Sequence, residues 1–90
     1  MKISLKTKLA YYLAARYPDK VKKIVLEDWI RENGASVDAG ASRLRELERE
    51  GIISKDYEDG FVRYQFLMTD WNRQRYGKMT DEEVLRYSMM

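Results

Sequence analysis

The stretch that decides the fold runs from Ser36 to Ile53 and reads SVDAGASRLRELEREGII. Apolar residues at positions 37, 41, 44 and 47 recur at helical spacing, which predicts a helix over residues 37–50. Ser36 is suited to the N-cap, because its hydroxyl can accept an N–H group of the first turn. Gly51 is suited to the left-handed position that ends such a helix, and the aliphatic pair after it begins a different pattern.

That pattern has the period of a β-strand. Residues 52–55 lead into a turn at Tyr57–Gly60, where an Asp-Gly pair is typical of tight hairpins. In the return segment Phe61–Leu67, positions 62, 64 and 66 point one way and positions 63 and 65 the other. The sequence therefore predicts a two-stranded hairpin directly after the helix.

Two further helices are predicted before Ser36. Residues 5–17 carry an apolar stripe, and Pro18 ends the helix because a residue before proline leaves helical geometry. A basic connector, 19–23, follows. Ile24 and Val25 fit either a short strand or the start of the next helix. That helix is predicted over residues 26–33. Its apolar face carries Leu26, Trp29 and Ile30.

The last part of the chain is predicted to be a helical tail, residues 69–90. Asp70 is expected to cap a short helix that ends at Gly77. Thr80 and Glu83 have the spacing of a capping box, which predicts a last helix.

Composition narrows the classes of function. Ninety residues indicate one domain, 1–90, with a core over about 5–68. The sequence contains neither cysteine nor histidine, which excludes disulfides, thiolate metal sites and histidine-based catalysis. No catalytic spacing links the remaining polar residues, so we expect no enzyme, no cofactor and no metal. No apolar run approaches the ~20 residues of a membrane span, and we expect a cytoplasmic protein without membrane contact.

The order of elements from Leu26 to Phe66, and above all the stretch Ser36–Ile53, resembles the winged helix-turn-helix superfamily of bacteria, archaea and phages. The resemblance implies an α+β, mostly helical fold. It would have a three-helix core, a hairpin wing and, here, a C-terminal helical extension. It further implies a small transcription regulator that binds double-stranded DNA with helix 37–50 in the major groove.

Small residues early in that helix would allow close approach to bases, and its arginines would reach base edges or phosphates. The net charge of +6 over residues 1–23 would add phosphate contacts. The residues expected to contact DNA are Ser36, Asp38, Ala39, Ser42, Arg43, Arg45 and Arg49 in the helix, Lys55 and Arg63 in the hairpin, and Lys22 and Lys23 in the connector.

The charge pattern also favours an alternative. Residues 24–60 carry a net charge of −5, and the hairpin tip holds three carboxylates that phosphates would repel. The arginines of helix 37–50 can form surface pairs with Glu46, Glu48 and Glu50. On this alternative the chain is a winged-helix protein–protein interaction module, of phage or mobile-element type, that does not bind DNA.

A homodimer formed by the tail is a further expectation, because many such regulators dimerise. The tail residues expected at its interface are Trp71, Tyr76 and Leu85.

Overall fold

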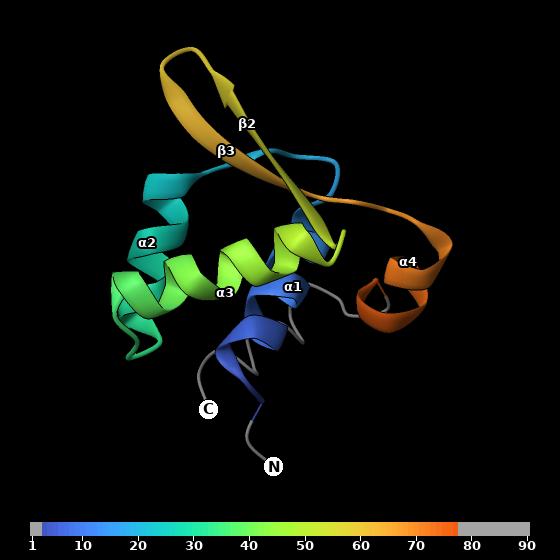
Figure 1. Cartoon of the computed structure of the whole chain (residues 1–90), viewed down its shortest axis with the longest axis horizontal. Helices are drawn as coiled ribbons and strands as arrows, with labels where there is room; N and C mark the ends of the chain where they lie inside the picture. The colour runs from blue at the N-terminus through green and yellow to red at the C-terminus, as the bar shows by residue number, and fades with distance from the viewer. Residues whose placement is uncertain (1–2, 78–90) are drawn as a thin grey trace.

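Three α-helices precede a β-hairpin in this chain, and a short helix follows it (Figure 1). The computed structural model describes residues 3–77 of the sequence. Its elements are α1 (Leu5–Arg16), β1 (Val21–Lys22), α2 (Lys23–Glu32), α3 (Val37–Arg49), β2 (Ile53–Glu58), β3 (Phe61–Phe66) and α4 (Asp70–Tyr76). The prediction of a mostly helical α+β domain, with a hairpin after the third helix, is confirmed. Within residues 3–77, every helix falls short of the length and apolar character that a bilayer crossing needs.

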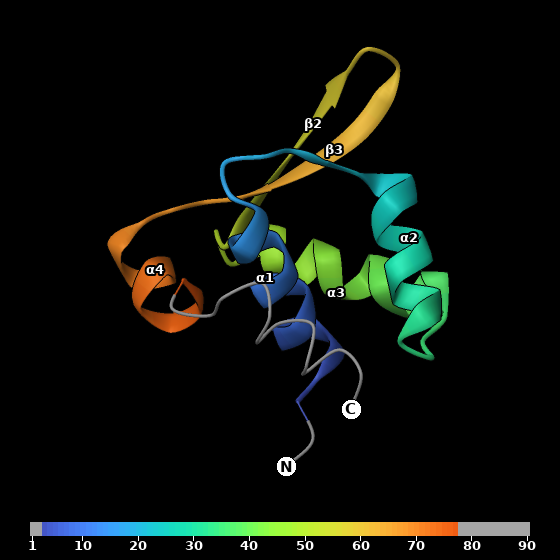
Figure 2. The same ribbon diagram turned by 180° about the vertical axis from the view of Figure 1, so that it is seen from behind.

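The three strands form one antiparallel sheet in the order β1-β3-β2. A two-residue turn joins β2 to β3. It consists of Asp59 and Gly60, with φ angles of 53° and 82°, the positive values that a tight, twisted hairpin requires. The predicted Asp-Gly turn is therefore confirmed. Figure 2 shows the hairpin projecting beyond the helices.

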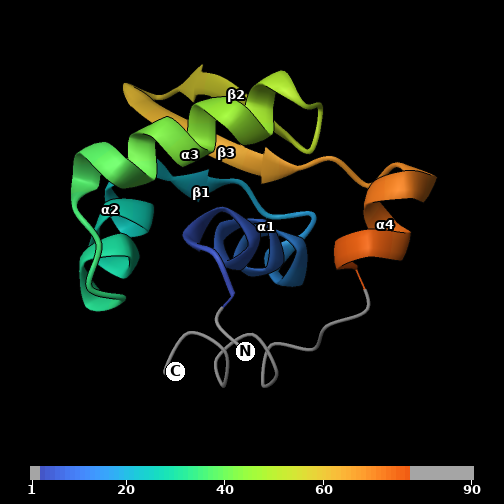
Figure 3. The ribbon, with the colours of Figure 1, turned by 60° about the horizontal axis from the view of Figure 1, so that its bottom comes forward.

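The hydrophobic core lies between the first three helices and the sheet, and α4 covers one end of it (Figure 3). The predicted apolar faces supply its buried side chains, among them Leu9, Leu13, Leu26, Ile30, Leu44, Leu47, Ile53 and Phe66. Tyr76 of α4 is also buried. Its ring centroid lies 5.5 Å from that of Tyr11 and 6.3 Å from that of Phe66, both in edge-on contacts. These contacts tie α4 to α1 and β3.

The second helix begins earlier than predicted. Ile24 and Val25, for which strand and helix were both open, lie in the first turn of α2. The strand comes before them, because Val21 pairs with Tyr64 of β3 and its side chain is buried. Ile24 and Val25 remain 59% and 44% exposed. Because their side chains do not belong to the buried face of α2, the apolar periodicity of the sequence could not show that the helix begins before Leu26.

The predicted cap at Ser36 is confirmed, whereas the predicted cap at Asp70 is wrong. Ser36 Oγ accepts the backbone N–H of Ala39 at 3.1 Å. At the fourth helix, Thr69 occupies the capping position, and its Oγ1 accepts the N–H of Asn72 at 3.1 Å. Asp70 is instead the first residue of α4, where a carboxylate is favoured by the positive end of the helix dipole.

The second and third helices approach each other closely at Gly40. This glycine is buried in the first half of α3 and faces Ile30 of α2. A Cβ atom at position 40 would overlap Cδ1 of Ile30 and lie 3.0 Å from its Cγ1 and Cγ2. Because Ile30 is itself buried in the core, its side chain has little room to move. The absence of a side chain at position 40 thus sets the distance between α2 and α3.

Gly40→Ala is expected to lower the free energy of unfolding. Overpacking costs about 1–3 kcal/mol, which exceeds the ~1 kcal/mol that alanine gains over glycine within a helix. Equilibrium unfolding in urea measures the change.

Ile30→Val provides the matched control, since it removes the Cδ1 atom that meets the new methyl group. Alone it is expected to cost about 0.5–1.5 kcal/mol. The double variant is expected to be more stable than the sum of the single losses predicts. Strict additivity would show that the two side chains do not meet.

Candidate nucleic-acid interface

One side of α3 is exposed along its whole length. Gly40, Leu44 and Leu47 form its buried side. Opposite them, at spacings of four, three and four residues, lie Asp38, Ser42, Arg45 and Arg49, which we call the outer stripe. The three charged residues of the stripe are exposed, and Ser42 is half-buried.

The two arginines of the outer stripe are available to a partner. Arg45 donates a hydrogen bond from Nη2 to Ser42 Oγ at 3.2 Å. Neither Arg45 nor Arg49 makes an ion pair with any residue that the structure describes. The pairs with neighbouring glutamates that the sequence allowed are therefore not formed at these two positions.

A different environment surrounds the flank of α3 that faces α1. Arg43 pairs with Glu46 at 3.0 Å, as the sequence spacing allowed. Lys6 of α1 lies 3.7 Å from Glu46 and also binds the carboxylate of Glu50. The hydrogen bond to Glu50 is the main cause that raises the pKa of Lys6. Glu46 and the C-cap residue Glu50 are thus held on the α1 side, away from the outer stripe.

The hairpin has two chemically distinct faces. The register places Lys55 opposite Tyr64 and Asp56 opposite Arg63, so Lys55 shares the face of the buried Tyr64. Lys55 is exposed, as is Tyr57, which lies on the same face. Tyr64 belongs to the same buried core as Leu44 and Leu47 of α3, so this face of the hairpin lies on the α3 side.

The carboxylates of the hairpin occupy the other face. Lys20 pairs with Asp56 at 2.8 Å and with Glu58 at 3.1 Å. Hydrogen bonds to these two groups raise the pKa of Lys20, the bond to Asp56 being the larger cause. The acidic character of the hairpin is therefore partly neutralised, and Asp56 and Glu58 point away from the side that carries Lys55.

The remaining predicted residues are distributed over several places. Lys22 and Arg63 are register partners on the acidic face of the sheet, and the ammonium of Lys22 lies 4.3 Å from the ring centroid of Phe61. Lys23 is exposed at the start of α2. Ser36 is used as a cap, with Ala39 exposed one turn later.

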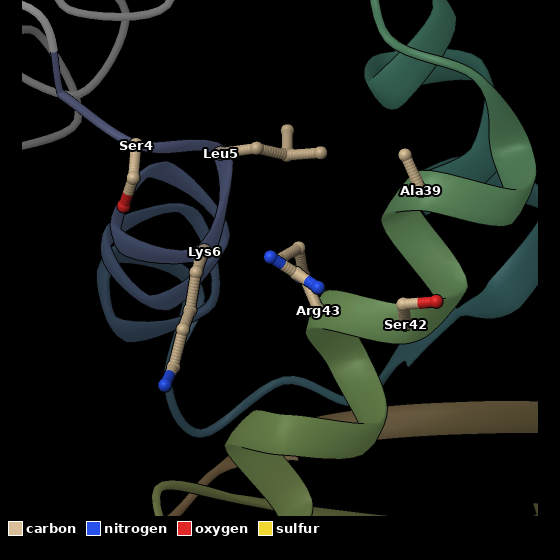
Figure 4. Close-up of a pocket in the computed structure, with 6 residues that line it drawn as sticks. All are labelled: Ser4, Leu5, Lys6, Ala39, Ser42 and Arg43. Atoms are coloured by element: carbon tan, nitrogen blue, oxygen red, sulfur yellow. The ribbon is translucent and has the colours of Figure 1, made fainter.

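Eight of the eleven predicted residues fall into three groups. The outer stripe and Lys55 lie on one side, Lys22 and Arg63 lie on another, and Arg43 turns toward α1 (Figure 4). The sequence did not indicate the roles of Lys6 and Lys20. Their partners are 44 and 38 residues away along the chain, so no local spacing could reveal them.

Of the tail residues expected at a dimer interface, the structure describes Trp71 and Tyr76. Tyr76 is buried in the core, so its ring is not presented to a second chain. Trp71 is 57% exposed, and the guanidinium of Arg75 lies 5.0 Å from its ring centroid. Leu85 and the last predicted helix, which begins after Thr80, lie outside the described residues.

Comparison with known proteins assigns no family to this geometry. No protein-family model matches the chain, and no curated protein or solved structure matches it significantly. Among residues 3–77, no three acidic side chains gather in a way that could hold a metal ion.

The packing of the hairpin against α3 predicts a pH dependence. Burial raises the pKa of the Tyr64 phenol above its usual value of 10, and Glu48 and Glu27 act in the same direction. The folded state therefore binds this proton more tightly than the unfolded state, so stability falls as the pH rises above about 10. We expect the thermal midpoint of the parent to fall between about pH 9 and pH 11, and that of Tyr64→Phe to fall less over the same range. Tyr57→Phe, a control at an exposed position, should show the same fall as the parent. An unchanged fall in Tyr64→Phe would assign the alkaline loss to other groups.

Proposed function

We propose that this chain is a winged-helix protein that binds double-stranded DNA, with α3 in the major groove and the hairpin as its wing. The observation that carries the proposal is the pair Arg45 and Arg49, which are exposed on the side of α3 opposite the core and make no ion pair within residues 3–77. Guanidinium groups in such a position suit both guanine edges and phosphates.

The arrangement of the helices supports the proposal. In a helix-turn-helix one helix braces another, and the second presents its free side to the groove. Here α2 packs against α3 at Gly40, and a four-residue connection joins them. The small side chains of Ala39 and Ser42 leave room for the backbone of α3 to approach base edges.

Electrostatics supports it as well. Glu46 and Glu50 would repel phosphates if they lay on the outer stripe, yet Lys6 holds both on the α1 flank. The stripe itself carries Asp38, Arg45 and Arg49, and its charge is net positive.

The hairpin is compatible with DNA on the side that adjoins α3. Lys55 and Tyr57 lie on that side, where they would meet the backbone next to the groove that α3 enters. Asp56 and Glu58 lie on the opposite face, paired with Lys20. The carboxylates of the tip therefore count less against DNA binding than their place in the sequence suggests.

Replacing both stripe arginines tests the proposal directly. Arg45→Ala with Arg49→Ala is expected to weaken binding to a mixed-sequence duplex by about tenfold or more. It should also reduce the slope of log affinity against log salt by about 2 if both contact phosphates. Fluorescence anisotropy of a labelled duplex, titrated at several salt concentrations, measures both quantities.

Arg73→Ala with Arg75→Ala is the matched control. It removes the same charge from α4, where both arginines are exposed. This variant should bind DNA nearly as well as the parent. Equal losses in the two variants would indicate a general charge effect, and no salt-sensitive binding by the parent at ~10⁻⁴ M would refute the proposal.

The two faces of the hairpin provide a second test. Lys55→Ala is expected to lower DNA affinity severalfold and the salt slope by about 1, because it removes one phosphate contact. Lys22→Ala removes the same charge from the opposite face and should have a smaller effect. The same anisotropy titration compares the two variants. A larger effect of Lys22→Ala would contradict the proposal, because it would place DNA on the acidic face of the sheet.

A second candidate function is protein–protein interaction, which the exposed aromatic side chains favour. Tyr57 and Phe61 near the hairpin turn are 74% and 46% exposed, and aromatic residues are common anchors in protein interfaces. On this alternative, Arg45→Ala with Arg49→Ala would fold normally and bind the partner protein as well as the parent does. Tyr57→Ala with Phe61→Ala would abolish that binding.

A further inference from the structure

A pocket of about 410 Å³ lies between the start of α1 and the first half of α3. A volume of this size falls within the range of small-molecule sites, ~300–1,000 Å³. Its lining residues are Ser4, Leu5, Lys6, Ala39, Ser42 and Arg43. Apart from Ser42, no residue of the outer stripe or of the hairpin lines this pocket.

The pocket has an apolar wall and two cationic side chains, Lys6 and Arg43. Figure 4 shows Leu5 of α1 extending toward Ala39 of α3, with the guanidinium of Arg43 between the two helices. The ammonium of Lys6 is engaged by Glu46 and Glu50. Within residues 3–77, Arg43 pairs with Glu46 through Nη2 alone, so its other guanidinium nitrogens are the cationic donors that a ligand would meet.

Arg43 retains hydrogen-bonding capacity. Its Nη2 pairs with Glu46, and among the described residues this is the one partner of the guanidinium. Its Nε is buried without a hydrogen-bond acceptor. A planar guanidinium with a free Nη1 is well matched to a carboxylate.

The surrounding charges limit the ligand to a single negative charge. Glu46 and Glu50 lie beside the pocket, and they would repel a phosphate dianion more strongly than a carboxylate. The methyl groups of Leu5 and Ala39 call for an apolar body. We propose that this pocket binds a small aliphatic monocarboxylate, with its carboxylate on Arg43 and its chain against Leu5 and Ala39.

The position of the pocket connects it to DNA binding, and this part of the inference rests on the proposed function. Ser42 belongs both to the pocket lining and to the outer stripe. A bound carboxylate would add a negative charge beside the side of α3 that faces DNA. The ligand is therefore expected to lower DNA affinity.

Hexanoate is the probe for the first experiment, an NMR titration of amide signals of the whole chain without DNA. Shifts are expected near residues 4–6 and 39–43, with a dissociation constant on the order of 1 mM for a fragment of this size. Acetate retains the charge without the chain, and 1-hexanol retains the chain without the charge. Each should bind about tenfold more weakly or worse. Shifts centred elsewhere, or acetate equal to hexanoate, would overturn the site.

Two variants and one control test the lining. Arg43→Leu removes the cation, and Ala39→Leu fills the pocket while the charge stays. Both should abolish the hexanoate shifts, and the dispersion of the amide signals reports whether each variant is folded. Arg73→Leu removes an exposed arginine from α4 and should bind hexanoate like the parent. Unchanged binding by folded Arg43→Leu and Ala39→Leu would refute the assignment.

A second experiment separates the pocket from the proposed function. DNA affinity is measured by anisotropy in hexanoate and in acetate at equal ionic strength. Weaker binding in hexanoate, absent in Arg43→Leu, supports the coupling. Equal affinities with intact hexanoate binding refute the coupling but support the pocket. A chain that binds hexanoate and no DNA refutes the proposed function alone.

Discussion

The rotation of α3 about its own axis is the constraint on which the rest of this structure depends. Only a narrow side of the helix, formed by Gly40, Leu44 and Leu47, is buried. Gly40 admits Ile30 of α2, and the leucines enter the core. Once that side is fixed, the helical period decides which residues face outward and which lie on each flank. If α3 were rotated by one residue in one direction, Glu46 and Glu50 would take the places of Arg45 and Arg49 on the outer stripe.

Ion pairs between distant segments then act on this arrangement. The pairs that Lys6 forms with Glu46 and Glu50, and Lys20 with Asp56 and Glu58, are partly exposed. Such pairs contribute little to stability, typically about 0–1 kcal/mol. Their effect on the distribution of surface charge is larger. Each lysine offsets two carboxylates on one face, so that face of α3 or of the hairpin differs in charge from the opposite one.

Much of the fold was predictable because local signals agree with the tertiary structure. The capping hydroxyl of Ser36, the stripe in residues 37–47 and the Asp-Gly turn each depend on neighbours within four residues. The predictions that failed or stayed open depend on distant contacts. β1 exists because Val21 meets Tyr64, and the role of Arg43 depends on where α1 lies. Of the candidate interface, the sequence indicated the arginines of α3 but could not say which of them are paired.

The same distance effect changes how the charge of the chain is interpreted. Residues 1–23 carry +6 and residues 24–60 carry −5, which along the sequence suggests a basic arm beside an acidic domain. In the fold, Lys6 and Lys20 are used against four of the carboxylates. Lys6 and Lys20 of the first segment are therefore engaged within the fold, and the surface of the second segment is not uniformly acidic. The net charge of a segment describes a partner surface only if that segment folds apart from the rest. Here the two segments fold together, so the sign of each surface is decided by which side chains face outward. On α3 the exposed charged side chains are Asp38, Arg45, Glu48 and Arg49.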